Sequence, residues 1–145
     1  MRPTGSGRAW GASYCINRLY LGLEALCIHN PATGREQTIA HLTPPTTGPR
    51  RRIVVVGAGP AGLEAARVAA AAAVVLFEAA PEPGGQVRLA ARATARRQDL
   101  IAITDWLAAE CRLLGVDIRL GTVGDGPDVV ALQPDVVIVA TGGSP

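Results

Sequence analysis

Three closely spaced glycines separate an apolar run from an alanine-rich segment, and this arrangement constrains the fold more than any other feature of the chain. Residues 53–56 are β-branched throughout, as in a strand buried on both faces of a parallel sheet. Gly57, Gly59 and Gly62 follow in the spacing GxGxxG. Residues 61–72 are rich in alanine, and Pro60 stands where a helix would begin. The sequence therefore predicts a strand, a tight turn and a helix in succession.

Each glycine of this turn meets a separate physical need. Gly57 permits the sharp exit from the strand, Gly59 lets the backbone approach a pyrophosphate, and Gly62 lets the helix pack closely on the strand. The amides and the dipole at the start of the helix stabilise phosphate charge. We therefore expect a diphosphate to bind along the whole turn, which comprises Gly57, Ala58, Gly59, Pro60, Ala61 and Gly62.

An acidic residue follows at the distance that nucleotide binding requires. A second predicted strand, residues 74–77, ends at Glu78, which lies 21 residues after Gly57. An acid about 20 residues after the first glycine accepts hydrogen bonds from a ribose and disfavours a 2′-phosphate. Turn and acid together predict a site for the ADP part of a dinucleotide. NAD and FAD share this part, so both remain open at this point.

The chain beyond Glu78 continues to alternate between helical and extended patterns. Apolar positions at helical spacing predict a helix over residues 99–114, and apolar runs predict strands over residues 116–120 and 136–139. We predict an α/β fold, a partial Rossmann-like doubly wound parallel sheet. Composition changes near Gly48, so we expect an irregular N-terminal extension over residues 1–48 and the nucleotide-binding domain over residues 49–145.

Composition limits the other classes of function. A chain of 145 residues with a net charge of +2 is the size of one domain, and no aromatic residues lie among its arginine clusters, so nucleic acid is not an expected partner. The apolar run over residues 69–77 is half of the ~18 residues that span a membrane, and no secretory signal is visible. The sparse cysteines, Cys15, Cys27 and Cys111, favour a reducing cytoplasm. We expect Cys111 to be a buried structural thiol on a helix face.

With these residues in view, the chain resembles the iron-sulfur flavin oxidoreductases that include trimethylamine dehydrogenase, 2,4-dienoyl-CoA reductase and N-methylproline demethylases. The resemblance spans nearly the whole chain and rests on Cys15-Ile-Asn-Arg, Cys27-Ile-His-Asn-Pro, Val54-Val-Val-Gly-Ala-Gly-Pro-Ala-Gly-Leu-Glu, Phe77-Glu, Pro83-Gly-Gly-Gln and Val139-Ala-Thr-Gly-Gly. It implies an FMN-containing barrel, then a cysteine-rich segment with a four-iron cluster, then this nucleotide domain, which binds FAD or only ADP. It also implies that Gly84, Gly85 and Gln86 lie beside the cofactor, and that Thr141 and Gly142 close the loop after the last strand.

The chain departs from the family pattern in three places. Ala9 and Ala12 stand where two of the four cluster cysteines belong, so we predict that no iron-sulfur cluster forms. The connection before Val74 is about two residues short and lacks a capping glycine, which removes roughly 3 Å of helix rise and predicts a displaced Glu78. The resemblance places a catalytic barrel before the cysteine segment and a second nucleotide domain after Pro145, so we expect the chain to represent only the first nucleotide-binding half of such an enzyme.

Two functions follow as expectations. The first is a fragment of an FAD-dependent or NAD(P)-linked oxidoreductase that binds its cofactor and is inactive alone, because the sequence carries no catalytic dyad, nucleophile motif or metal-ligand spacing. The second is a non-catalytic nucleotide-binding module, or degenerate fragment, that docks on a separate flavin-containing subunit. The resemblance favours FAD over NAD through Pro83-Gly-Gly-Gln and Ala140-Thr-Gly.

Overall fold

The computed structural model describes residues 9, 11–40, 48–95 and 97–143. The chain divides into two compact units, residues 2–45 and residues 46–145, and each is described here by itself. The C-terminal unit contains a parallel β-sheet with helices, and the N-terminal unit consists mainly of turns.

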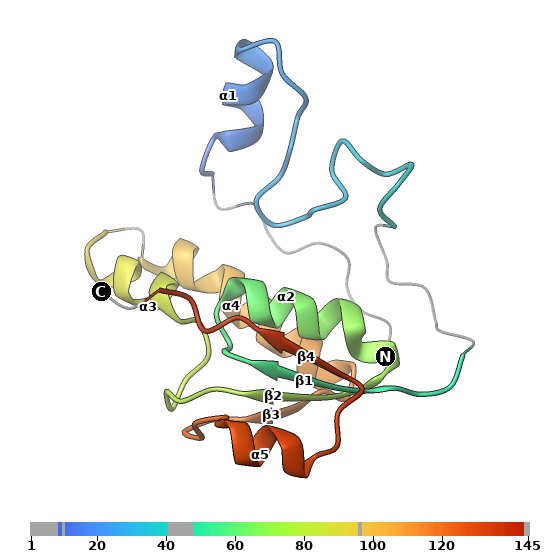
Figure 1. The fold of residues 1–145 in the computed structure, drawn as a ribbon. Helices are drawn as coiled ribbons and strands as arrows, with labels where there is room; N and C mark the ends of the chain where they lie inside the picture. The colour runs from blue at the N-terminus through green and yellow to red at the C-terminus, as the bar shows by residue number, and fades with distance from the viewer. Residues whose placement is uncertain (1–8, 10, 41–47, 96, 144–145) are drawn as a thin grey trace. The chain divides into compact units, whose positions relative to one another are not determined.

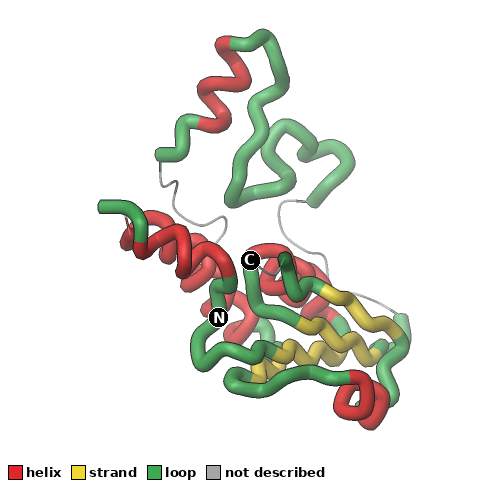
Figure 2. Tube along the Cα trace, turned by 60° about the vertical axis from the view of Figure 1, so that its left-hand side comes forward, coloured by secondary structure: helices red, strands yellow, loops and turns green. Residues whose placement is uncertain are grey.

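The sheet of the C-terminal unit consists of four parallel strands, β1 (Arg52–Val56), β2 (Ala73–Phe77), β3 (Asp117–Arg119) and β4 (Val136–Val139). Their spatial order is β3-β2-β1-β4, and they lie side by side in Figure 2. Val54 of β1 lies opposite Val75 on one side and Val137 on the other. The order reverses between β1 and β4, and such a switch point opens a crevice at the carboxyl ends of the strands.

Helices cover both faces of this sheet (Figure 1). On one face, α2 (Pro60–Val68) and α4 (Arg97–Leu113) enclose the main core, which includes Val55, Leu63 and Leu76. On the opposite face, α5 (Gly126–Ala131) packs Val129 against the strands. Helices on both faces of a parallel sheet make the fold doubly wound and Rossmann-like, as the alternation of patterns predicted.

Helix α2 begins and ends as its residues dictate. Pro60 occupies its first turn, where the missing N–H costs no hydrogen bond. The helix buries Gly62, Leu63 and Ala66, the small and apolar face that packs on the sheet and on α4. It continues into a 3₁₀ turn over Ala69–Ala71 and then directly into β2. The alanine run therefore supplies both the end of the helix and the short connection, without a glycine cap.

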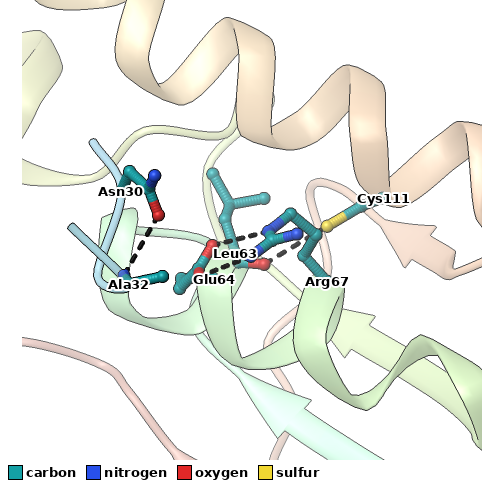
Figure 3. A network of polar contacts seen from close by, with 6 residues as sticks. All are labelled: Asn30, Ala32, Leu63, Glu64, Arg67 and Cys111. Atoms are coloured by element: carbon teal, nitrogen blue, oxygen red, sulfur yellow. Dashed lines mark hydrogen bonds and ion pairs between the residues drawn. The ribbon is translucent and has the colours of Figure 1, made fainter. Parts of the chain in front are cut away.

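Cys111 of α4 is buried, as expected for a structural thiol. Its Sγ donates a hydrogen bond to the carbonyl oxygen of Leu63 over 3.3 Å, which ties α4 to α2. Near this contact, the guanidinium of Arg67 on α2 donates to both carboxylate oxygens of Glu64 on the same helix, at 2.7 and 2.8 Å (Figure 3). Burial raises the pKa of the Cys111 thiol to about 11, so this thiol stays protonated at neutral pH and is a poor nucleophile.

Three short helices were not predicted from the sequence. They are α1 (Tyr14–Tyr20), α3 (Gln86–Arg92) and α5. The last begins with a recognisable cap, because the side chain of Asp125 accepts a hydrogen bond from the backbone N–H of Asp128 over 3.0 Å. The other two begin without a side-chain cap, which explains why their ends leave little trace in the sequence.

The N-terminal unit contains α1 followed by a series of turns, in line with the predicted irregular extension. In one of these turns, the side-chain oxygen of Asn30 accepts a hydrogen bond from the backbone N–H of Ala32 over 3.0 Å (Figure 3). Across the described ranges of both units, every helix is too short or too polar to cross a lipid bilayer.

Candidate nucleotide-binding site

A crevice of about 350 Å³ opens at the carboxyl ends of the strands, where the strand order reverses. It is bounded by the loops that follow β1, β2, β3 and β4. Its lining is mostly apolar or glycine, and Glu78 is the acidic residue within it. Nine of the sequence-predicted residues line this crevice: Gly57, Gly59, Pro60, Ala61, Glu78, Gly85, Gln86, Thr141 and Gly142.

Gly57 and Gly62 give the first turn its compact shape. Gly57 has a φ of 103°, which L side chains rarely adopt, and a Cβ there would overlap with the backbone of Ala140. A Cβ on Gly62 would overlap with the carbonyl oxygen of Gly57. Gly57 therefore requires glycine because the loop after β4 passes directly beside it, and Gly62 requires glycine because the start of α2 packs on the turn. Gly62 and the fully buried Ala58 support the turn from behind and do not line the crevice.

Gly59 differs from Gly57 and Gly62 because no protein atom crowds the position of its missing side chain. Its backbone has φ −70° and ψ 178°, which any residue can adopt, and no atom lies within 4 Å of the position a Cβ would take. Its carbonyl oxygen accepts the first hydrogen bond of α2, from the N–H of Leu63 over 2.9 Å. The fold therefore does not require glycine at this position, and the missing side chain leaves the crevice open beside the start of α2.

Glu78 holds its carboxylate against the first turn. Its Oε2 accepts a hydrogen bond from the backbone N–H of Ala58 over 2.7 Å, and its Oε1 accepts one from the N–H of Ala80 over 2.9 Å. The short connection before β2 thus leaves the carboxylate in contact with the glycine turn. Each oxygen retains a second acceptor position, because an ionised carboxylate accepts about four hydrogen bonds in all.

The loop after β2 packs directly on the first turn. The backbone N–H of Gly84 donates to the carbonyl oxygen of Ala58 over 2.8 Å. A Cβ built on Gly85 would lie 3.2 Å from the Cα of Gly59, so two glycine backbones meet at close range. The Nε2 of Gln86 donates to the carbonyl oxygen of Gly143 over 3.0 Å, which joins this loop to the one after β4.

Sequence reasoning missed one part of the crevice wall. Thr122, Val123 and Gly124, which follow β3, also line the crevice. A Cβ on Gly124 would lie 2.8 Å from the side chain of Phe77, so this loop can pass the end of β2 only with a glycine there. The rule that ligands bind beyond the carboxyl ends of parallel strands could have identified this loop, because it follows a predicted strand.

The residues of the N-terminal unit do not fit the four-iron cluster that the family resemblance implies. A cavity of about 200 Å³ is lined by Ala9, Ala12, Cys15 and Cys27. Four thiolates hold such a cluster, and the methyl groups of the two alanines cannot bind iron. Within the part of the chain that the structure describes, no three His, Cys, Asp or Glu side chains are grouped to hold a metal ion.

We predict that the chain remains free of iron after anaerobic incubation with iron and sulfide. Of the four positions where the family has cluster cysteines, only Cys15 and Cys27 carry thiols. Iron and acid-labile sulfide analysis measures this directly. A double variant, Ala9→Cys with Ala12→Cys, is the positive control and is expected to turn brown. Stoichiometric iron-sulfur absorption in the unaltered chain would show the prediction to be wrong.

Comparison with known proteins connects this geometry to a group of enzymes. Residues 55–102 match the family model of an NAD(P)-binding Rossmann-like domain. Over 137 residues the chain is 52% identical to a probable N-methylproline demethylase of Rhizobium meliloti, and over 138 residues it is 52% identical to an N,N-dimethylglycine/sarcosine dehydrogenase of Chromohalobacter salexigens. Each match covers 93% of this chain and 20% of the relative. The chain is a homologue of these oxidoreductases.

A solved structure extends the likeness to three dimensions. The structure of 2-naphthoyl-CoA reductase in complex with 2-naphthoyl-CoA matches with a TM-score of 0.82 and 30% sequence identity, over 91% of this chain and 20% of that chain. These matches confirm the resemblance to N-methylproline demethylases and related oxidoreductases, and they confirm the Rossmann-like fold. The chain spans about a fifth of the length of the relatives it matches.

Proposed function

We propose that this chain binds the ADP moiety of a dinucleotide cofactor, FAD in the first place, as the nucleotide-binding part of an oxidoreductase. The observation that carries the proposal is the open space around Gly59. Its backbone faces the crevice at the start of α2, and no protein atom occupies the position of its missing side chain. A diphosphate has the charge and shape to occupy this space.

Backbone amides would bind the diphosphate. Ala61 precedes Leu63, whose N–H makes the first hydrogen bond of α2 to Gly59, so the amides of Gly59 and Ala61 lie at the positive end of the helix. Ala61 also lines the crevice. The described lining contains no lysine or arginine, so the helix terminus supplies the favourable electrostatics.

The carboxylate of Glu78 would bind the ribose. It lines the crevice and is fixed by two backbone N–H groups, which leaves acceptor positions for ribose hydroxyls. Its negative charge would repel a 2′-phosphate, so the proposal favours FAD, ADP or NAD over NADP. The loops that contain Gln86 and Thr141 face the same crevice, and the family resemblance associates both with the flavin nucleotide.

The residues around the crevice bind and orient, and a bound flavin would supply electron transfer. Glu78 is the titratable side chain in the described lining, and its carboxylate already accepts two backbone hydrogen bonds. We therefore propose that the isolated chain has no redox activity of its own. Turnover of a nicotinamide cofactor with an electron acceptor, in the absence of any other chain, would contradict this.

The identity of the nucleotide is tested by releasing it from the purified full chain. The proposal expects a yellow protein, and mass spectrometry of the extract should identify FAD. Recovery of NAD or NADP in stoichiometric amount would overturn the assignment to FAD. Reconstitution with FAD, ADP and NADP, followed by gel filtration, provides the same comparison for protein purified without its ligand.

A second candidate is a nucleotide-binding module that docks on a separate flavin-containing subunit. The exposed strand β4 favours it, because β4 is an edge strand of the described sheet and Val137 and Val139 are 44% and 73% exposed. This candidate predicts colourless protein that binds ADP and lacks flavin. A flavin retained through purification would favour the first proposal.

A further inference from the structure

Arg88, on helix α3, makes polar contacts with two separate parts of the C-terminal unit, the loop after β2 and helix α4. Its Nε donates to the carbonyl oxygen of Pro83 over 2.5 Å, and its Nη1 lies 2.8 Å from a carboxylate oxygen of Glu82. Its Nη2 lies 3.5 Å from Oδ1 of Asp105, on α4. The side chain is 25% exposed, and neither it nor its partners line the nucleotide crevice. One guanidinium thus fastens the loop after β2 to a helix of the core.

The side chain of Arg88 also packs against Gly84. A Cβ built on Gly84 would lie 3.0 Å from Cγ of Arg88 and 3.2 Å from Oγ1 of Thr104. Gly84 has a φ of 130°, which leaves this position to glycine. Arg88 and the buried Thr104 therefore determine how closely the Gly84 backbone approaches α4.

From Gly84 the contacts lead directly to the first turn. The N–H of Gly84 donates to the carbonyl oxygen of Ala58, while the N–H of Ala58 donates to Oε2 of Glu78. Ala58 is therefore held by both of its backbone polar groups. Gly59 follows Ala58 in the first turn, and Gly85 follows Gly84 in the loop after β2. The backbones of Gly59 and Gly85 lie close together on the crevice wall. A shift of the Gly84 loop would move both glycine backbones.

We infer that Arg88 is a positioning residue for the diphosphate part of the nucleotide site, acting through Gly84 and Ala58. This inference rests on the proposed function, because it assigns Arg88 to the same crevice. A planar guanidinium holds five N–H donors in a rigid fork, whereas an ammonium group is a compact charge with three rotatable donors on a flexible stem. Arg88 therefore keeps the two loops at the separation that a diphosphate requires, without touching the ligand.

The test compares ADP and adenosine binding in the full chain and its variants by calorimetry. Arg88→Ala is expected to weaken ADP binding about tenfold, because a site loses affinity when its supporting contacts are removed, and adenosine binding should change less than twofold. Arg88→Lys should recover only part of the loss. Arg92→Ala is the matched control, since Arg92 is exposed on the last turn of the same helix, and it should leave both affinities unchanged.

Unchanged ADP affinity in Arg88→Ala would overturn the inference, and so would an equal loss for ADP and adenosine. If Arg88→Ala does not fold, the double variant Glu82→Gln with Asp105→Asn removes the charge of both acidic partners of Arg88. Both side chains are exposed, so these substitutions disturb the fold little. That double variant should weaken ADP binding about threefold, and unchanged affinity would again overturn the inference. Absence of ADP binding in the unaltered chain would instead refute the proposed function.

Discussion

Replacing Gly59 by leucine is expected to weaken ADP binding by at least about a hundredfold while the protein stays folded. The leucine side chain would enter the open space beside the start of α2, where the diphosphate is proposed to lie. The backbone at Gly59 already has dihedral angles that leucine adopts without strain. The free energy of unfolding should fall by no more than about 1 kcal/mol, the usual cost of losing a favourable residue at a helix N-cap.

Calorimetric titration with ADP and denaturant unfolding together measure these two effects. Gly126→Leu is the matched control, because Gly126 opens the short helix α5, lies outside the crevice and also has no atom within 4 Å of its missing Cβ. It should leave ADP affinity unchanged. A Gly59→Leu protein that binds ADP as tightly as the unaltered chain would show that the diphosphate is not at this turn.

Replacing Gly62 by alanine is expected to destabilise the fold by about 3 kcal/mol, at the upper end of the cost of overpacking. One added methyl group would overlap with the carbonyl oxygen of Gly57, and its other near neighbours are a Gly57 backbone carbon and the Cβ of Ala140. These atoms belong to or adjoin the backbone and cannot rotate away, so α2 would have to move off the sheet.

Thermal unfolding followed by circular dichroism should show a decrease in Tm of roughly 12 to 24 °C for Gly62→Ala, at 4 to 8 °C per kcal/mol for a unit of this size. Gly59→Ala provides the comparison, since the same methyl group meets no protein atom there. Equal melting temperatures for the two variants would mean that α2 does not pack on the turn as described.

The elements around the first turn could be predicted because several independent signals coincide there. β-branched residues, glycine spacing, the proline at the helix start and the acid at Glu78 indicate the same strand, turn, helix and strand, which the structure contains as β1, α2 and β2. α4 and β4 were also predicted, from apolar spacing and from an apolar run.

The parts that could not be predicted lack such coincidence. Helix α3 carries Leu89 57% exposed and buries only Ala91, so its apolar positions show no clear period. The contacts of Arg88 depend on Asp105, 17 residues away, and the Glu78 contact with Ala58 spans 20 residues. Such contacts arise when the sheet brings separate loops together, and local patterns do not encode them.

The central claim is that backbone groups at the start of α2 bind a diphosphate. Its most direct test is a pair of calorimetric titrations of the unaltered full chain, one with ADP and one with adenosine. The account predicts saturable binding of ADP at a single site, and at least about a hundredfold weaker binding of adenosine, because the phosphates interact with the helix terminus. Equal affinity for the two ligands, or no saturable binding of ADP, would contradict it.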